Sequence, residues 1–553
     1  MAHASESASV RFGTSGFRGR WGIEYTEPVV QGITQAVCDF LTSEGLHGKV
    51  VTIGYDSRQH ADIAASWCAA VVRRNGFAVH LTSRDTPTPA LAFYAAEVLA
   101  ERSAGVLNCT ASHNPIDWHG IKFSLHDGSI SPPRATDFIS RRATAYRRTE
   151  LAKPDLSAIS PGPVESIDPR EAYCRWLLDS GANDCRISLD HERMRAYFAD
   201  KLVVIDEMHG TGRDYLRTVL DEIGVPYRVI HGERDPKLGG LRAANPEEPH
   251  IQGLKDAVRE AGAAIGLGLD TDADRYGIVD RGGIYVEPNA ILAMLTRYLG
   301  PERKLTGCVS TTYVTTHILD RIAADIPGNE PFRPAPGALP MHRRDPNYEI
   351  VCGDSSGMVT ENVFTVLTGL KYIIQVPQMD PDYQLLDDPP ADWRCRLLIG
   401  GEQASGLTSK GHIPDKDGMW AALLVLDMVA AFGRPLQEIW AETQSIYGAS
   451  ITAPLNLPVP VEQKAAFIDS FLDTARRGDR LAGMLVVFAG GIPGNYAELM
   501  LADATGITDN YLHVRPSGTE PLVRVYLETA TETALDALKA DVDARIQLLA
   551  TQT

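Results

Sequence analysis

The chain has 553 residues, 44% of them apolar, and a formal net charge of −18 with a pI near 5.3. Its length exceeds what one hydrophobic core usually supports, so we expect three or four domains. The acidic charge argues against a nucleic-acid or anionic-membrane partner, because both are bound through clustered Lys and Arg side chains.

Neither a membrane anchor nor a cysteine framework is predicted. The first ten residues are polar and lack the features of a secretory signal. The longest apolar run, Trp420 to Phe432, contains Asp427 and is too short to span a bilayer, so we expect a buried helix. The eight cysteines show no metal-ligand spacing. They suggest neither a zinc site nor disulfides, and a reducing cytoplasm fits best.

Short β-branched runs alternate with helical patterns along most of the chain. Val50 to Ile53, Leu202 to Ile205 and Ile265 to Leu269 are typical of buried strands. The turn His209 to Gly212 follows the second of these and leads into a helical stretch. The alternation predicts repeated β-α units with mixed or parallel sheets, and therefore α/β domains.

Four domains are predicted, at residues 1–165, 185–300, 301–440 and 450–553. The first boundary rests on the Pro- and Ser-rich segment 153–169, which we expect to break regular structure. Residues 378–393 are rich in Asp and Pro and are predicted to form a solvated insertion. The last hundred residues combine strands near Val486 and Val523 with an amphipathic closing helix, which indicates a smaller α+β domain.

The Ser112 loop, Thr110-Ala111-Ser112-His113-Asn114-Pro115, follows the β-prone run Gly105 to Cys109. Its Asn-Pro pair prevents the strand from continuing, which predicts an exposed serine hydroxyl on a tight loop. Such a serine is suited to carrying a phosphoryl group. On its own, an ordinary turn would explain these residues equally well.

The aspartate loop, residues 270–275, places Asp270, Asp272 and Asp274 directly after an apolar run. A turn can bring three such hard oxygen ligands onto one cation, and Mg²⁺ is the natural occupant. An EF-hand is disfavoured because its sixth and twelfth positions are Arg275 and Arg281 instead of Gly and Glu. A solvated acidic loop is the alternative reading.

The Arg515 loop, Arg515-Pro516-Ser517-Gly518-Thr519-Glu520-Pro521, brings a guanidinium, two hydroxyls and glycine amides together. These groups are the ones that hold a phosphate. A plain turn explains the Pro and Gly but not the joint occurrence of Arg, Ser and Thr.

Together with Gly400-Gly401-Glu402-Gln403-Ala404-Ser405-Gly406, these loops resemble those of the α-D-phosphohexomutase superfamily, the phosphoglucomutase and phosphomannomutase group. The resemblance implies three similar α/β domains and a smaller C-terminal α+β domain around a central active-site cleft. It implies a mutase that interconverts sugar 1-phosphate and 6-phosphate, with glucose or mannose as the sugar. Such an intramolecular phosphotransferase works through a phosphoserine and a bisphosphorylated intermediate.

The resemblance also implies roles for individual residues. The implied catalytic residues are Ser112, His113, Lys122 and Arg275; the substrate-binding residues are Arg18, Lys371, Glu402 and Ser405; the phosphate-binding residues are Arg515, Ser517, Gly518 and Thr519; and the metal ligands are Ser112, Asp270, Asp272 and Asp274. Mg²⁺ and a sugar 1,6-bisphosphate activator are expected. The implied partner is a phosphorylated sugar, without nucleic acid or membrane, and the protein is a monomer or a homodimer.

Three positions depart from the usual pattern of this superfamily. His119 replaces the common Asn before Gly120, and Thr271 replaces the Gly between the first two aspartates. Ala404 and Ser405 stand where Ser and Gly are usual. We expect these changes to affect sugar recognition more than phosphoryl transfer, although a required positive φ at Thr271 would weaken metal binding. A pentose or amino-sugar mutase, a phosphatase and a non-catalytic sugar-phosphate-binding protein are the alternatives.

Overall fold

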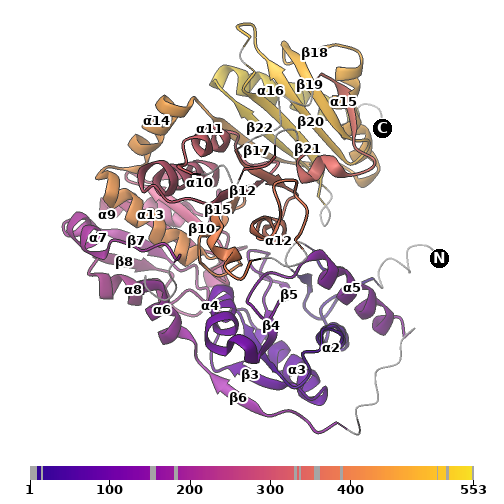
Figure 1. Cartoon of the computed structure of the whole chain (residues 1–553), viewed down its shortest axis with the longest axis vertical. Helices are drawn as coiled ribbons and strands as arrows, with labels where there is room; N and C mark the ends of the chain where they lie inside the picture. The colour runs from indigo at the N-terminus through magenta and orange to yellow at the C-terminus, as the bar shows by residue number, and fades with distance from the viewer. Residues whose placement is uncertain are drawn as a thin grey trace. The chain divides into compact units, whose positions relative to one another are not determined.

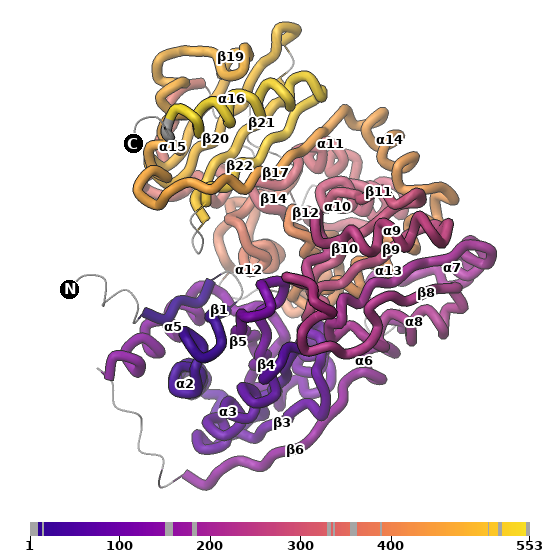
Figure 2. The backbone as a smooth tube through the Cα atoms, turned by 180° about the vertical axis from the view of Figure 1, so that it is seen from behind, coloured from indigo at the N-terminus to yellow at the C-terminus, as the bar shows by residue number. Residues whose placement is uncertain are grey.

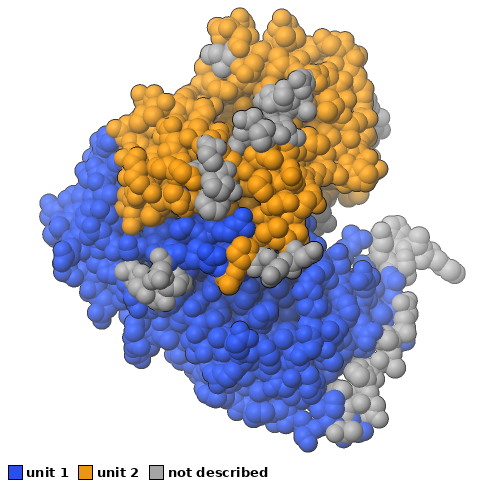
Figure 3. All heavy atoms as spheres, in the orientation of Figure 1, with its two compact units in different colours: residues 1–291, 369–375, 392–438 blue, residues 292–368, 376–391, 439–553 orange. Residues whose placement is uncertain are grey.

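The computed structural model describes residues 9–13, 16–149, 157, 159–179, 185–328, 333–335, 338–353, 362–386, 390–506, 508–517 and 522–550. The chain forms two compact units (Figure 3). Unit 1 comprises residues 1–291, 369–375 and 392–438, and unit 2 comprises residues 292–368, 376–391 and 439–553. Neither unit is therefore a continuous segment of the chain.

Unit 1 contains a six-stranded mixed sheet in the order β1-β5-β4-β2-β3-β6 (Figure 1). Its strands are β1 (Phe17–Arg20), β2 (Val50–Tyr55), β3 (Ala78–Thr82), β4 (Ser103–Cys109), β5 (Trp118–Ser124) and β6 (Val164–Ile167). The strands β4, β2, β3 and β6 run parallel, whereas β5 is antiparallel to β4 and β1. The helices α2 (Glu27–Ser43), α3 (Ala61–Arg74) and α5 (Pro133–Arg147) share a hydrophobic core with these strands. Figure 2 shows α2, α3 and α5 beside the strands of this sheet.

A second sheet of unit 1 has the order β11-β10-β9-β7-β8. Its strands are β7 (Val203–Asp206), β8 (Tyr227–Ile230), β9 (Ile265–Leu269), β10 (Tyr276–Asp280) and β11 (Ile284–Val286). Its three neighbouring strands β8, β7 and β9 run parallel, and β10 and β11 then alternate in direction, as β5 and β1 do beyond the four parallel strands of the first sheet. The strand β9 therefore occupies the position that β4 occupies in the first sheet. The predicted repetition of α/β units is confirmed in these two sheets.

Two strand pairs and one apolar helix make up the third α/β region. In unit 2, β12 (Cys308–Thr312) pairs in parallel with β14 (Phe364–Val366), and in unit 1, β15 (Leu397–Glu402) pairs antiparallel with β16 (Gly406–Ser409). The helix α13 (Gly418–Phe432) is buried almost throughout, as predicted for Trp420 to Phe432. The carboxylate of Asp417 caps its first turn, and Asp427 within it pairs with Arg193 at 2.7 Å.

The C-terminal part of unit 2 is an antiparallel sheet in the order β13-β19-β20-β21-β22-β17, with β18 paired to β19. Its strands are β13 (Glu349–Cys352), β17 (Ile451–Pro458), β18 (Arg480–Leu481), β19 (Met484–Ile492), β20 (Tyr496–Ala502), β21 (Asn510–Pro516) and β22 (Leu522–Thr529). The helices α15 (Lys464–Arg476) and α16 (Glu532–Ala550) share its core (Figure 1). The predicted α+β class of this region is confirmed.

The remaining α-helices are shorter or connect the sheets. They are α4 (Thr88–Phe93), α6 (Arg170–Leu178), α7 (His191–Phe198), α8 (Tyr215–Ile223), α9 (Gln252–Ala261), α10 (Pro288–Arg297), α11 (Ile318–Ala324), α12 (Leu370–Ile373) and α14 (Leu436–Tyr447). Among the described residues, no single helix is long and apolar enough to cross a membrane. The helices α13 and α14 are long and apolar enough only when taken together, and the pair is bent by 76°.

The expectation for the Pro-rich segment 153–169 is wrong in part, because β6 lies within it and pairs with β3. Proline at the border of an edge strand is tolerated because the outer N–H needs no partner in the sheet. The Asp- and Pro-rich segment 378–393 exposes apolar side chains, with Leu385 at 55%, in its described portion. Met379 and Tyr383 of the same segment are buried, so the described portion is solvated only in part.

The expectation that no cysteines pair is also wrong. Cys185 and Cys395 form a disulfide across a sequence separation of 210 residues, with their Cα atoms 5.4 Å apart. Spacing along the chain carries no signal for two cysteines that meet only in the fold. The other six cysteines, all among the described residues, are not joined in disulfides.

The disulfide predicts the number of reactive thiols. After denaturation without reductant the chain should react with a thiol reagent at six positions, rising to eight after reduction. Cys185→Ser should leave seven reactive thiols both before and after reduction. Because the unfolded chain is then no longer restrained by the bond, the free energy of unfolding should fall by about 2–4 kcal/mol. Eight thiols in the unreduced wild-type chain would contradict the bond.

Candidate active site

The Ser112 loop leaves the carboxyl end of β4 and turns sharply. Ser112 adopts φ = +52°, in the left-handed region, which costs an L-residue about 1–2 kcal/mol. Its amide donates to Thr110 Oγ1 at 2.8 Å, and its hydroxyl donates to Asp270 Oδ2 at 2.7 Å. Ser112 is 3% exposed, so the prediction of an exposed hydroxyl is wrong. The Ser112 side chain is covered because it lies against the aspartate loop.

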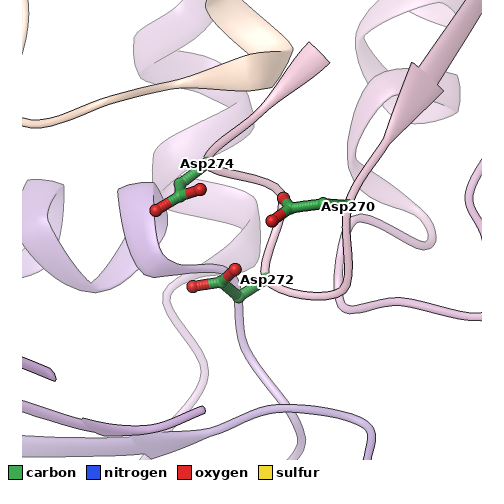
Figure 4. Close-up of side chains that lie close together, drawn as sticks. All are labelled: Asp270, Asp272 and Asp274. Carbon is green, nitrogen blue, oxygen red and sulfur yellow. The ribbon is translucent and has the colours of Figure 1, made fainter. Parts of the chain in front are cut away.

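The aspartate loop leaves the carboxyl end of β9 and brings its three carboxylates together (Figure 4). One oxygen from each of Asp270, Asp272 and Asp274 lies within 4.8 Å of the others, and all three residues are buried. The residue with positive φ in this loop is Ala273, at +56°. Thr271 does not adopt positive φ, so the condition under which it would weaken metal binding is not met.

Side chains from the first sheet hold the aspartate loop in place. Lys122 Nζ, on β5, pairs with Asp272 Oδ2 at 2.5 Å and also with Asp274. Thr88 Oγ1, at the start of α4, donates to the same Asp272 oxygen at 2.5 Å and accepts from Asn108 Nδ2 at 2.8 Å. The two sheets of unit 1 therefore build this cluster jointly.

Burial and like charge set the protonation of the carboxylates. Burial, reinforced by Asp272 and Asp274, raises the pKa of Asp270 well above its usual value. Burial also tends to raise the pKa of Asp274. The positive charges of Lys122, Lys416 and Arg275 outweigh this effect, so the pKa of Asp274 is lowered. Although burial opposes its charge, the pKa of Lys122 is raised because Asp272 and Asp274 stabilise the ammonium.

The donor set fits a hard divalent cation. Asp272 Oδ1 and Asp274 Oδ1 are buried and have no hydrogen-bond partner. Buried polar atoms are seldom left unpaired, and three converging carboxylates repel one another without a cation between them. Oxygen-only ligands are those that Mg²⁺ prefers. The cluster can therefore hold a metal ion.

Three further predicted residues lie around this cluster. His113 Nδ1 is 3.4 Å from Ser112 Oγ, and burial together with Arg275 holds the pKa of His113 well below its usual range. The amide of Arg275 donates to Asp270 Oδ1 at 3.1 Å. Arg18, on β1, is buried enough to lower its pKa despite the nearby charges of Asp272 and Asp274.

At Gly120 the backbone of β5 passes close to the backbones of both β1 and the Ser112 loop. A Cβ atom at Gly120 would lie 2.5 Å from the carbonyl oxygens of both Phe17 and Thr110. Only glycine fits there, because real Cβ atoms do not approach a backbone oxygen so closely. Gly120 thus lets Arg18 and Lys122 converge on the aspartates.

Glu402 and Ser405 lie at the turn between β15 and β16. The negative charge of Glu402 contributes to raising the pKa values of Arg275 and Lys416, which places it beside these cations. Ser405 is buried, and its hydroxyl donates to Glu247 Oε1 at 2.7 Å. The hydroxyl of Ser405, which stands one position later than the usual Ser of the superfamily motif, is therefore bonded within the protein.

Lys371, on α12, lies apart from the aspartates. Its ammonium stands 5.3 Å from the centre of the Tyr372 ring, and burial lowers its pKa while Asp137 opposes that shift. Within the described ranges, no hydrogen bond or ion pair joins Lys371 to the three aspartates.

The Arg515 loop belongs to unit 2, and its first two residues, Arg515 and Pro516, are the last residues of β21. Arg515 Nη2 donates to Tyr526 Oη at 2.9 Å, and the amide of Ser517 donates to the carbonyl of Leu522 at 2.9 Å. Gly518 and Thr519 lie outside the described residues.

His119 packs among aromatic rings instead of reaching the carboxylates. Its ring centre lies 4.7 Å from that of Trp21 and 5.5 Å from that of Tyr25. Burial, with Arg58 and His60, lowers the pKa of His119 to about 3. The imidazole is therefore neutral near pH 7.

The motifs did not reveal Thr88 and Lys416 as members of the cluster. Lys416 Nζ lies 3.3 Å from Asp274 Oδ2, and Thr88 bonds Asp272. In the sequence, Lys416 could have been found through the segment Gly411 to Gly418, which follows residues 400–406 and contains it. Thr88 carries no such signal, because it meets the aspartates only through the packing of two sheets.

Four domain models of one family match the chain. They are described as phosphoglucomutase/phosphomannomutase, alpha/beta/alpha domain I at residues 9–150, domain II at 184–283, domain III at 360–447 and the C-terminal domain at 462–545. The matches follow the chain in the order expected for one protein of this family.

Relatives and solved structures agree with these matches. A phosphoglucosamine mutase of Salinispora tropica is 26% identical over 94% of this chain and 95% of its own length. Phosphoglucomutase 1 of Drosophila melanogaster is 26% identical over 79% of this chain and 72% of its own length. The parafusin (phosphoglucomutase) structure from Paramecium shares the fold, with a TM-score of 0.71 and 18% identity over 97% of this chain and 94% of that one. The chain belongs to the phosphoglucomutase/phosphomannomutase family, the phosphohexomutases, and is an isomerase of the intramolecular phosphotransferase type.

Proposed function

We propose that the chain interconverts sugar 1-phosphate and sugar 6-phosphate through a phosphoryl group carried by Ser112. The observation that carries this proposal is the 2.7 Å bond between Ser112 Oγ and Asp270 Oδ2 within a buried cluster of three carboxylates. A hydroxyl held against potential metal ligands is suited to phosphoryl transfer, because that reaction needs placement and neutralisation of charge more than covalent activation.

Mg²⁺ is the proposed metal, held by Asp270, Asp272, Asp274 and the phosphoryl group on Ser112. When bound, it neutralises charge on the transferred phosphoryl oxygens. The unpaired Oδ1 atoms of Asp272 and Asp274 support this ligand set. On binding, Lys122 would share these carboxylates with the metal and keep its positive charge beside the reacting oxygens.

In the first half-reaction the P–Oγ bond of phosphorylated Ser112 breaks as a P–O bond to the sugar hydroxyl forms. The sugar hydroxyl gives up a proton, and Ser112 Oγ gains one. Lys122, protonated in its ion pairs, is assigned donation of a proton to Ser112 Oγ and then uptake of the proton that the sugar hydroxyl releases, with the neutral His113 beside Ser112 Oγ as a supporting group. Arg275 and Lys416 stabilise the negative charge that develops there.

The second half-reaction requires the bisphosphorylated sugar to present its other phosphate to Ser112. We assign the non-reacting phosphate to Arg515, Ser517, Gly518 and Thr519, whose residue types suit it. Arg18, Lys371, Glu402 and Ser405 are assigned to the sugar and its phosphate, with the Glu402 carboxylate accepting sugar hydroxyls. A sugar 1,6-bisphosphate would restore the phosphoryl group on Ser112 and so act as activator.

The proposed sugar is glucose or mannose, with an amino sugar as the second candidate. The phosphoglucosamine mutase of Salinispora tropica supports the second candidate, since it aligns over 94% of this chain. Of the two residues of this loop assigned to the sugar, Ser405 donates its hydroxyl to Glu247 in the described structure, and the Glu402 carboxylate is assigned the acceptance of sugar hydroxyls.

Replacing the serine tests the mechanism. Purified protein with Mg²⁺ and a trace of glucose 1,6-bisphosphate should carry one phosphoryl group by intact mass. It should also isomerise a hexose phosphate without releasing free phosphate. Ser112→Ala should lose both properties, with activity falling by at least about 1,000-fold, because the only proposed phosphoryl carrier is gone. Glucose, mannose, glucosamine and pentose phosphates should be compared as substrates.

Ser131→Ala is the matched control, since Ser131 is also buried and its hydroxyl donates to the carbonyl of Phe123. It should keep the phosphoryl group and the activity. Steady release of phosphate by the wild type would indicate a phosphatase instead. Tight sugar-phosphate binding without turnover or phosphorylation would indicate a binding protein.

The raised pKa of Asp270 predicts a pH dependence of metal binding. Because this carboxyl takes up a proton at a higher pH than an ordinary aspartate does, Mg²⁺ must displace that proton as the pH is lowered, and its affinity should fall with the pH. Asp272→Asn should weaken Mg²⁺ binding by about tenfold or more, measured by calorimetry. Asp280→Asn, another buried carboxylate at the far end of β10, should bind Mg²⁺ as the wild type does. Equal affinity in Asp272→Asn would refute the ligand assignment.

The assignment of Arg515 predicts a change in KM. Arg515→Lys replaces a planar group that can hold a phosphate with two N–H donors by a point charge, so KM for the sugar phosphate should rise about tenfold. Arg476→Lys, an exposed arginine of the same unit, should leave KM unchanged. Steady-state kinetics measure both, and an unaltered KM in Arg515→Lys would remove that loop from the proposal.

A further inference from the structure

Arg58 is a fully buried arginine beneath the Ser112 loop. It lies between β2, which ends at Tyr55, and α3, which begins at Ala61, and only 1% of it is exposed. A guanidinium so far from water must find partners for all its N–H groups, because an unpaired buried charge is strongly destabilising.

The partners of Arg58 are the backbone carbonyls of one loop. Its Nη2 donates to the carbonyls of Ser112 at 2.5 Å and Asn114 at 2.7 Å. Its Nη1 donates to those of Pro115 at 2.8 Å and Trp118 at 3.5 Å. One side chain thus gathers carbonyls from both ends of the turn that follows Ser112.

Asp56 fixes the guanidinium itself. Arg58 Nε donates to Asp56 Oδ2 at 3.2 Å, and the Arg58 amide donates to Asp56 Oδ1 at 3.0 Å. The amide of Asp56 donates to the carbonyl of Cys109, the last residue of β4. The arginine is therefore anchored to the same strand end from which the Ser112 loop departs.

This anchorage acts on the backbone of Ser112. The residue has φ = +52°, which an L-residue adopts only when its surroundings impose it. A bond to its carbonyl restrains the peptide plane that follows, while the amide is bonded to Thr110 Oγ1 on the other side. Together these bonds set the direction in which Oγ points toward Asp270.

We propose that Arg58 is a positioning residue for phosphoryl transfer, holding Ser112 in its left-handed conformation through the carbonyls of residues 112–118. The proposal rests on the proposed function of Ser112. Among the described residues no hydrogen bond or ion pair joins Arg58 to the three aspartates, so its action on the chemistry passes through the loop. A lysine would keep the charge but lacks the forked donors that reach several carbonyls at once.

Arg58→Lys and Arg58→Ala, made in the full chain and assayed with Mg²⁺ and glucose 1,6-bisphosphate, test the proposal. The double variant Asp56→Asn/Arg58→Ala, which also removes the buried carboxylate charge, is used if the single alanine variant does not fold. Three quantities are measured: the rate of Ser112 phosphorylation by rapid quench and intact mass, kcat with KM, and Mg²⁺ affinity by calorimetry.

Folded variants should lose about 100-fold in the phosphorylation rate and in kcat, since a displacement near 1 Å costs that much. Their KM and Mg²⁺ affinity should stay within about threefold of the wild type, because the residues assigned to the sugar and the three carboxylate ligands remain. Arg186→Met is the matched control, a buried arginine that also donates to backbone carbonyls, those of Trp176 and Asp179. It should lower the unfolding temperature without lowering kcat.

A folded Arg58 variant with wild-type kcat would overturn the proposal. So would a loss of kcat matched by equal losses in KM and metal affinity, or by the same loss in Arg186→Met. Absence of a phosphoryl group on Ser112 in the wild type would refute the proposed function instead, so the two failures are distinguishable.

Discussion

The site depends on keeping three carboxylates together out of water. At an effective dielectric constant of about 20, two such charges within 4.8 Å repel by on the order of 3 kcal/mol. Lys122 and Lys416 oppose this repulsion directly through their ion pairs, and the Arg275 charge lowers the pKa of Asp274. The cations Lys122, Lys416 and Arg275 beside the aspartates also favour an anionic substrate locally, although the chain as a whole is strongly acidic.

Repeated topology explains how residues far apart in the sequence meet at this point. The Ser112 loop follows β4 and the aspartate loop follows β9, and these strands hold the same position in their two sheets. Glu402 likewise ends β15, just before an antiparallel return. Loops at the carboxyl ends of strands are the usual sites of ligand binding in α/β sheets. Each α/β region therefore offers its loop in the same way.

Much of the fold and of the candidate site could be predicted from the sequence because loops with chemistry leave local patterns. The strand Ile265–Leu269 and the buried helix near Trp420 were predicted from apolar runs alone. Thr88, Arg58 and the Cys185–Cys395 bond could not be predicted, since each acquires its partner only when separate segments pack. The burial of Ser112 was missed for the same reason, because a turn read in isolation looks exposed.

The single disulfide has a topological consequence. Cys185 and Cys395 are covalently joined. The strands β9 and β10, which flank the aspartate loop, lie between these two cysteines in the sequence. A protease cut anywhere in that interval would leave one molecule rather than two fragments. The nicked protein would separate on a denaturing gel only after a reducing agent was added.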